Sequence, residues 1–176
     1  MKEGIVGAVF DYGLGEIPDE LYDAFRAAGP ERLTVAGKLG LPQVICPGGA
    51  EHLGILVSNP NEVPEAYRDY KHVFHNPIVF VPRLKSEEMV RVAREITSRL
   101  AHTKGKAYFM LPTKGVSRYS SKGMVLEDVE SDEAFFNEIR TTLPKNIELI
   151  ERETHAEDPE FVKEAVNLLI SLIETA

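Results

Sequence analysis

The sequence predicts an α/β fold: a Rossmann-like, three-layer α/β/α arrangement around a mainly parallel sheet. Short apolar runs without alternation are typical of strands that are buried on both faces. These runs alternate with segments whose apolar residues recur at helical spacing, which favours a parallel sheet covered by helices. The predicted strands are residues 5–10, 43–46, 78–81, 107–111 and 147–150.

The first half of the chain contains two predicted helices and a long irregular connection. A helix is expected over 17–28, because a proline and acidic residues occupy its first turn and a Gly-Pro pair follows it. A second, shorter helix is expected over 31–38. Residues 47–70 are punctuated by glycine and proline, and so long a connection in a compact domain is often functional. Residues 72–75 are predicted as an extra short strand.

The second half contains the clearest helix, over 86–102. A serine is its expected N-cap, and four apolar residues repeat at helical spacing along it. After the strand at 107–111 comes a loop, with a short extended piece expected at 124–126. The last two helices are expected over 132–143 and 159–173.

Composition narrows the class of protein. The length of 176 residues predicts one α/β domain over 1–176, and 43% hydrophobic with 27% charged residues is typical of a globular protein. The net charge is −8 without any run of lysine or arginine, which argues against a nucleic-acid ligand. No apolar run approaches a membrane span of about 20 residues, and no signal-peptide pattern is present. With Cys46 as the single cysteine, we expect a cytoplasmic protein without an intramolecular disulfide.

Each predicted strand is followed by residues that suit catalysis or binding. In open α/β sheets, ligands bind in the crevice outside the carboxyl ends of the strands. Five such segments at the same end of five strands therefore predict a site at that edge. The segments are Asp11, Pro47-Gly48-Gly49, Arg83, Lys114-Gly115-Val116-Ser117 and His155.

Two of these loops and one arginine predict a pocket for a small anion. Glycines let backbone N–H groups approach an anion, although the same glycines also suit a tight turn. Arginine suits bidentate recognition of an oxyanion, and a lysine beside a serine can neutralise and hold one. The residues expected to hold the anion are Gly48, Gly49, Arg83, Lys114, Gly115 and Ser117. The dinucleotide fingerprint and the P-loop pattern are both absent.

Histidines and carboxylates near the strand ends are the catalytic candidates. His155 and His75 are suited to proton transfer near neutral pH, although a lone histidine is more often a hydrogen-bonded structural residue. Asp11 and Glu16 are candidates for a base, metal ligands or hydroxyl acceptors; alternatively Asp11 caps its turn and Glu16 is solvated. Asp158 either orients His155 or caps the last helix, and the capping role is preferred.

The sequence indicates no dedicated metal site. Glu51 and His52 are residue types that can bind a metal ion, but none of the usual zinc-ligand spacings is present. Mg²⁺ held loosely by Asp11 or Glu16 together with a phosphate-bearing ligand is the cofactor compatible with the sequence. Cys46 is expected to be a small buried residue. Glu51 and Asn76 complete the expected ligand-binding set.

Five short motifs occur in a characteristic order: Pro42-Gln43-Val44, Pro47-Gly48-Gly49, His75-Asn76-Pro77, Leu111-Pro112-x-x-Gly115-Val116-Ser117 and Thr154-His155-x-x-Asp158-Pro159-x-Phe161. In this order the chain resembles the C-terminal half of uncharacterised protein family 0261, the family of the tomato mosaic virus resistance protein. The resemblance implies two linked Rossmann-like domains, of which the N-terminal one is implicated in ATP binding, and it implies no settled reaction.

The chain also departs from the pattern of that family. Glu51 stands where the family usually has aspartate, and Gly54 lies near a position where it has asparagine. The family often reads H-I-N-D-P where this chain has His155-Ala156-Glu157-Asp158-Pro159. Loss of an asparagine removes a two-way hydrogen-bonding group, so the resemblance is compatible with an altered site.

Together these observations predict a domain that binds, and in one hypothesis chemically converts, a phosphate- or carboxylate-bearing metabolite. The alternatives are a non-catalytic binding module or a dimerisation module that pairs with a separate N-terminal family domain or subunit. Homo-oligomers are expected in either case. Catalysis would require His155, Asp11 and Lys114 to converge in one pocket.

Overall fold

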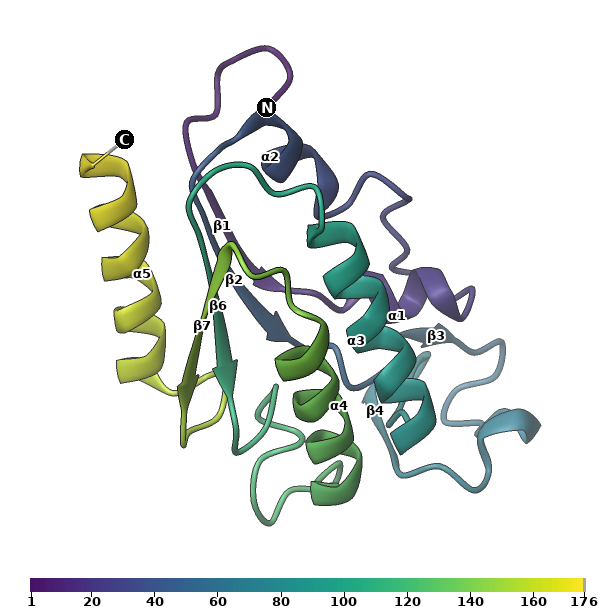
Figure 1. Ribbon diagram of the computed structural model, residues 1–176. Coiled ribbons are helices and arrows are strands. Elements are labelled where there is room, and N and C mark those ends of the chain that lie inside the picture. Colours follow the sequence, from purple (N-terminus) through teal and green to yellow (C-terminus); the bar gives the residue numbers. More distant parts are fainter. Residues whose placement is uncertain (176) are drawn as a thin grey trace.

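The computed structural model describes residues 1–175. Its main sheet has four parallel strands in the order β1-β2-β6-β7, which are β1 (Val9–Gly13), β2 (Gln43–Gly48), β6 (Ala107–Pro112) and β7 (Ile147–Arg152). The helices are α1 (Glu16–Leu21), α2 (Thr34–Leu39), α3 (Ser86–Leu100), α4 (Val129–Thr142) and α5 (Pro159–Glu174). As Figure 1 shows, α3 and α4 cover one face of this sheet and α5 covers the other. The three-layer α/β/α prediction is confirmed.

The uneven distribution of helices follows from the strand order. The connection between two consecutive parallel strands of one sheet is right-handed in nearly all proteins. Because the order β1-β2-β6-β7 steps in one direction, the connecting helices fall on the same face. Only α5, which follows the last strand, returns over the opposite face (Figure 1).

Side chains alternate along the strands and therefore build two cores. On β6, Phe109 and Leu111 face α3 and α4, whereas Met110 faces α5. The larger core also takes the buried face of α3, from Met89 to Leu100, as its helical periodicity predicts. The smaller core includes Cys46, which is buried as expected.

The predicted strand at 78–81 does not belong to the main sheet. It is β5 (Val79–Pro82), and it lies between β3 (Ile55–Leu56) and β4 (His72–Asn76) in a separate antiparallel sheet. The Asn76 side chain accepts hydrogen bonds from the backbone N–H groups of Ile78 and Val79, at 3.1 and 3.0 Å, and so fixes the hairpin turn. The extra strand predicted at 72–75 is confirmed as β4.

Other boundaries differ for local reasons. The first strand begins at Val9 rather than residue 5, and α1 ends at Leu21 because Asp23 adopts a positive φ of 54°. Residues 124–126 form turns, not an extended piece. The Asp158 side chain accepts from the backbone N–H groups of Glu160 and Phe161, so the preferred N-cap of α5 is confirmed.

The remaining element is a 3-10 turn at Glu65–Tyr67, within the long connection between β3 and β4. The serine expected to cap α3, Ser86, is instead its first helical residue, and its hydroxyl lies 3.2 Å from that of Ser131 on α4. No helix among residues 1–175 combines the length and the apolar character that crossing a bilayer requires.

Candidate functional site

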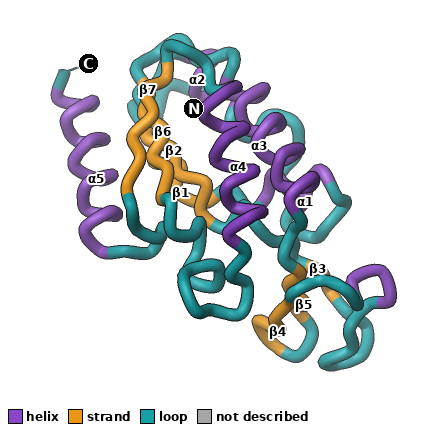
Figure 2. The backbone as a smooth tube through the Cα atoms, turned by 60° about the horizontal axis from the view of Figure 1, so that its bottom comes forward, coloured by secondary structure: helices purple, strands orange, loops and turns teal. Residues whose placement is uncertain are grey.

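The carboxyl ends of all four parallel strands lie at one edge of the main sheet. Figure 2 brings this edge forward, with the loop after β6 in front of the strands and the small β3-β5-β4 sheet beside it. The loops that follow β1, β2, β6 and β7 carry most of the residues that the sequence analysis selected. The edge is therefore the place to look for convergent polar groups.

A connected group of polar side chains lies beneath this edge, and we call it the edge cluster. Its members come from the loops after α1, β2, β5 and β6 and from the first turn of α4: Arg26, Glu51, His52, Arg83, Ser117 and Asp132. Glu51 is at its centre and is fully buried. Its Oε1 accepts a hydrogen bond from the Ser117 hydroxyl, and its backbone carbonyl accepts one from Arg83 Nη1 at 3.0 Å.

The predicted anion-binding Arg83 lies inside this cluster, with only 2% of its surface exposed. Its Nη2 donates to Asp132 Oδ1 at 2.6 Å. The guanidinium charge is therefore balanced within the protein, between the carboxylates of Asp132 and Glu51. Arg83 therefore organises the edge from below and is almost entirely shielded from solvent.

Burial and charge act in opposite directions on the two carboxylates. Burial alone raises the pKa of Glu51, but the neighbouring His52 and Arg83 and the hydrogen bond from Ser117 lower it to about 2. Burial raises the pKa of Asp132 to about 6, and the Glu51 charge adds to this effect while Arg83 opposes it. Asp132 is thus a carboxylic acid that titrates close to neutral pH.

The edge cluster also contains polar atoms without partners. Glu51 Oε2, His52 Nδ1 and Arg83 Nε are buried and make no hydrogen bond to any residue from 1 to 175. His52 Nδ1 lies 3.1 Å from Glu51 Oε1, but outside hydrogen-bonding geometry. Buried polar atoms are nearly always paired in folded proteins, and clusters of exceptions mark sites that carry strain or function.

A pocket of about 280 Å³ opens between the end of β6 and the start of α4, and we call it the lysine pocket. It is lined by Thr113, Lys114, Ser120, Lys122, Glu127, Val129, Asp132, Glu133 and Phe136. Its three carboxylates already have partners: Glu127 accepts from the Gly123 N–H, Asp132 from Arg83, and Glu133 lies 3.5 Å from Arg140. Neither lysine forms an ion pair with any residue in the described part of the chain.

A second pocket, of about 400 Å³, lies between the ends of β1 and β2 and is lined by Gly13, Gly15, Glu16, Arg26, Gly48 and Gly49. Its charged groups are engaged elsewhere: Arg26 pairs with Asp19 at 2.8 Å, and Glu16 lies 3.8 Å from Arg32. The Gly49 N–H donates to the Val116 carbonyl at 2.9 Å. Close packing accounts for Gly48, since a Cβ there would lie 2.5 Å from the Tyr12 carbonyl oxygen.

The structure does not bring the three predicted catalytic residues together. Asp11 is paired with Arg32 and lines a separate cleft beneath the N-terminal segment. His155 Nδ1 accepts a hydrogen bond from the Glu157 N–H, and His75 Nδ1 lies 3.3 Å from the Tyr119 hydroxyl. Lys114, which was expected to join His155 and Asp11 in one pocket, lines the lysine pocket without them.

Three other selected residues have local roles at the edge. Gly115 has a φ of 127°, and a Cβ there would lie 2.9 Å from the Ser121 nitrogen, so the loop after β6 requires glycine. Ser117 belongs to the edge cluster, and Asn76 fixes the β4-β5 turn. No group of three or more His, Cys, Asp or Glu side chains within residues 1–175 is arranged to hold a metal ion.

Sequence reasoning missed Asp132, although a signal was present. Asp132 precedes Phe135, Phe136 and Ile139 at helical spacing, which places it on the inward face of α4. A carboxylate on an apolar helix face is unusual and requires a buried partner. Arg26 and Lys122 were also missed, and no local pattern distinguishes them from solvated residues.

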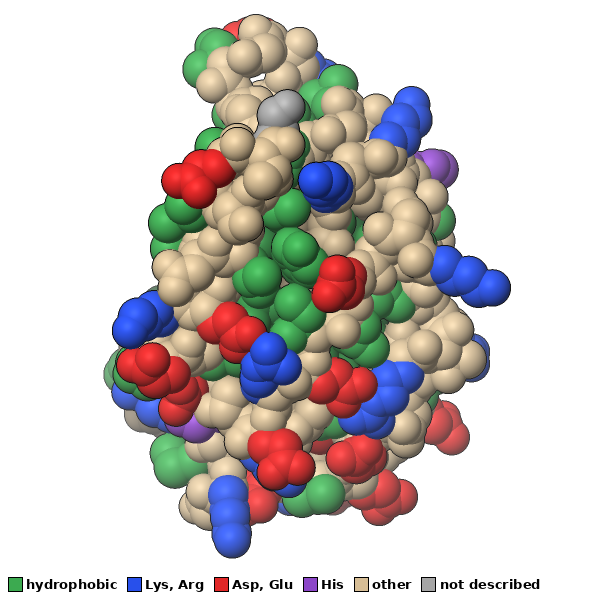
Figure 3. Space-filling model, turned by 60° about the vertical axis from the view of Figure 1, so that its left-hand side comes forward, with side chains coloured by type: hydrophobic (Ala, Val, Ile, Leu, Met, Phe, Trp, Pro, Cys, Tyr) green, Lys and Arg blue, Asp and Glu red, His purple; other side chains and the backbone are tan. Residues whose placement is uncertain are grey.

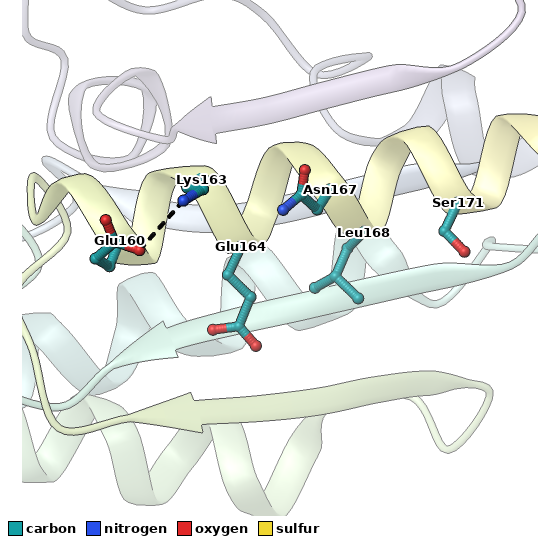
Figure 4. Close-up of a pocket in the computed structure, with 6 residues that line it drawn as sticks. All are labelled: Glu160, Lys163, Glu164, Asn167, Leu168 and Ser171. Atoms are coloured by element: carbon teal, nitrogen blue, oxygen red, sulfur yellow. Dashed lines mark ion pairs between the residues drawn. The ribbon is translucent and has the colours of Figure 1, made fainter.

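A shallow hollow of about 320 Å³ runs along α5 (Figure 4). All six residues that line it belong to α5, among them Glu160 and Lys163, whose charged groups lie 3.7 Å apart. The hollow contains none of the predicted site residues, and we assign it no ligand.

Comparison with known proteins gives one consistent result. The model of "Uncharacterised protein family (UPF0261) C-terminal domain" matches residues 1–173. A UPF0261 protein of Clostridium tetani is 31% identical over 176 residues, covering 99% of this chain and 43% of that protein. A UPF0261 protein of Brucella melitensis is 31% identical over 167 residues, covering 94% of this chain and 39% of that protein. The chain thus spans about two fifths of the length of these relatives.

Proposed function

The chain belongs to the uncharacterised protein family UPF0261 as its C-terminal domain, and we propose that it binds a small phosphate- or carboxylate-bearing molecule in the lysine pocket. The observation that carries this proposal is the charge balance of the pocket. Its carboxylates are neutralised or hydrogen-bonded within the protein, while Lys114 and Lys122 are unpaired within residues 1–175. An anion would supply the missing counter-charge.

The start of α4 supports the same ligand class. Val129, Asp132 and Glu133 of its first turns line the pocket, so the pocket lies beside the positive end of a 14-residue helix. Gly115 shapes the loop that carries Lys114, and Ser117 ties that loop to Glu51. Through Glu51 and Ser117 the edge cluster thereby holds Lys114 in place, while its member Asp132 lines the pocket itself.

For an enzymatic reaction, Asp132 is the proton donor or acceptor that we propose. It lines the lysine pocket, and its Oδ2 accepts no hydrogen bond from any residue within 1–175. A carboxyl group with a pKa of about 6 exchanges protons readily at neutral pH. The catalytic roles expected from the sequence for His155, His75 and Asp11 stay predictions. So do Mg²⁺ as a cofactor and the ligand-binding roles of Glu16, Gly48, Gly49, Glu51 and Asn76.

Several broader expectations also stay predictions. They are the cytoplasmic location, the homo-oligomer, the single-domain organisation and a purely non-catalytic or dimerising role. The relation to the tomato mosaic virus resistance protein is likewise a proposal, since the names of the relatives above do not refer to it.

A thermal-shift screen tests the proposed function. The chain is heated with inorganic phosphate, sugar phosphates and small dicarboxylates, with and without Mg²⁺. A ligand at about 100 times its Kd stabilises the native state by about 2.7 kcal/mol. We expect at least one anion to raise the Tm, and we expect Lys114→Ala with Lys122→Ala to abolish the rise.

Lys104→Ala is the matched control, because Lys104 is exposed and precedes β6 at the opposite edge of the sheet. This variant should respond to the anion as the wild type does. An equal rise in the double lysine variant, or no rise with any anion, would contradict the proposal.

A further inference from the structure

One face of the main sheet is covered by a single helix. An α-helix is about 10 Å wide, whereas four strands spaced about 4.8 Å apart present a wider surface. The helix α5 packs on β1 and β2 and shares its core with β6. The surface of the sheet and helix on either side of α5 therefore has no covering layer. These two flanks of α5 differ in the kinds of side chain that they expose.

The flank toward β7 carries an ion pair beside an apolar side chain. Figure 4 shows Glu164 and Leu168 pointing from α5 toward β6 and β7, and Glu164 accepts a 2.9 Å hydrogen bond from Arg152 of β7. The free edge of β7 also carries Glu148, whereas Glu151 pairs with Arg140 of α4 on the opposite face. Charged residues on an edge strand discourage another chain from pairing with it.

The flank toward β1 is apolar. Val166, Ile170 and Ile173 of α5 are 39%, 46% and 53% exposed. They are spaced four and three residues apart, so they form one stripe, and helix geometry places that stripe about half a turn away from Glu164. It therefore faces away from β7 and toward the β1 side of the sheet. Figure 3 shows hydrophobic side chains among the charged ones on the side of the molecule that carries α5.

The edge strand β1 continues this apolar surface. Phe10 is 38% exposed and pairs in register with Val44, a residue of the core beneath α5. The ring of Tyr12, near the end of β1, lies 6.3 Å from that of Phe161 in the first turn of α5. The helix thus runs antiparallel to β1, which brings its later residues toward Phe10. We call Phe10, Val166, Ile170 and Ile173 the β1 flank.

The edge strand β1 carries fewer charged residues than the edge strand β7. Within residues 1–175, β1 pairs with β2 only, and the one charged residue of β1, Asp11, is neutralised by Arg32. An edge strand with little charge beside an exposed apolar helix stripe is typical of a surface that another domain covers.

The relatives identify the polypeptide that could cover it. This chain matches a C-terminal domain and spans 43% and 39% of two relatives, so these proteins contain a long polypeptide outside the matched region. A polypeptide that precedes a C-terminal domain enters it through the segment corresponding to residues 1–8, which leads directly into β1. We propose that the β1 flank is the docking surface for the N-terminal domain of the family.

A footprinting experiment tests this assignment. The part of the Clostridium tetani relative that precedes its matched region is fused to residue 1 of this chain, and hydroxyl-radical labelling is compared with the chain alone. We expect labelling of Phe10, Ile170 and Ile173 to fall at least threefold in the fusion. Ile78 is a matched control, because it is 49% exposed on the small sheet and should label equally in both proteins.

Two further readouts make the result decisive. Phe109 is fully buried and reports folding, so its labelling should stay low in both proteins. Ile170→Glu in the fusion should restore labelling of Ile173. Equal labelling of the β1 flank in the two proteins would overturn the proposal. Protection already present in the chain alone, together with a dimeric mass, would also overturn it, in favour of a second copy as the occupant.

Discussion

The pH dependence of folding tests the environment that the structure gives to Asp132. Burial raises the pKa of this carboxyl group from 3.8 to about 6, with Glu51 adding to the effect and Arg83 opposing it. A group whose pKa is higher in the folded state binds its proton more tightly there. Its contribution to stability is therefore fully present below pH 3.8 and is lost as the pH rises through 6.

The size of the effect follows from the shift. A pKa change of about two units corresponds to about 3 kcal/mol, and about 2.5 kcal/mol of it falls between pH 7 and pH 4. Asp132→Asn replaces the carboxyl with a neutral group of the same shape and removes this titration. The wild type should thus gain about 2.5 kcal/mol more stability than the variant when the pH falls from 7 to 4.

Urea unfolding at pH 7, 6, 5 and 4 measures this difference for both proteins. Glu133→Gln is a matched control, because the neighbouring Glu133 is exposed and its removal should leave the profile of the wild type unchanged. Parallel profiles of wild type and Asp132→Asn, within about 0.5 kcal/mol, would refute the reasoning. So would a variant that gains more than the wild type, since Arg83 would then outweigh burial.

Three further predictions concern single side chains. The pKa of Glu51 is lowered from 4.5 to about 2, so the wild type should lose about 2.5 kcal/mol more stability than Glu51→Gln as the pH falls from 4.5 to 2, which urea titrations of both proteins measure. Asp158→Ala removes the N-cap of α5 and should cost about 1 kcal/mol in urea unfolding; an unchanged midpoint would contradict the capping role. Gly48→Ala places a Cβ 2.5 Å from the Tyr12 carbonyl oxygen and should lower the Tm by about 2–12 °C. Gly7→Ala, with no atom within 4 Å of the added Cβ, should leave the Tm unchanged.

Local patterns predicted the elements that depend on neighbours in the sequence. The apolar face of α3 follows from helical spacing, and the four apolar residues that this spacing selects are all buried. The N-cap of α5 follows from an aspartate directly before a proline. In both cases the determining interactions lie within about four residues, so the sequence alone contains them.

Elements that depend on distant partners were predicted less well. The apolar run that forms β5 looks the same whether it pairs in the parallel sheet or with β3 and β4, which are its partners here. The run before β1 is equally apolar, yet the register of Val9 with Gln43 starts the strand there. Pairing choices of this kind are made by tertiary contacts that composition does not reveal.

The candidate site also combines features that the sequence predicts with features that depend on distant partners. The position of the edge follows from parallel strands, and Lys114, Glu51 and Ser117 lie there as expected. The partner of Arg83 is Asp132, 49 positions away, and no local rule joins them. Consequently the sequence indicated which groups are present but not which cations are neutralised, and that distinction directs the proposal to Lys114 and Lys122.

The central claim is that a small anion binds at Lys114 and Lys122, and NMR can test its location directly. The ¹⁵N-labelled chain is titrated with inorganic phosphate while amide chemical shifts are followed. We expect saturable shifts within residues 113–122 and 127–136, and none along α5. Saturable shifts confined to the Gly48-Gly49 loop or to α5, or no saturable shift at all, would contradict it.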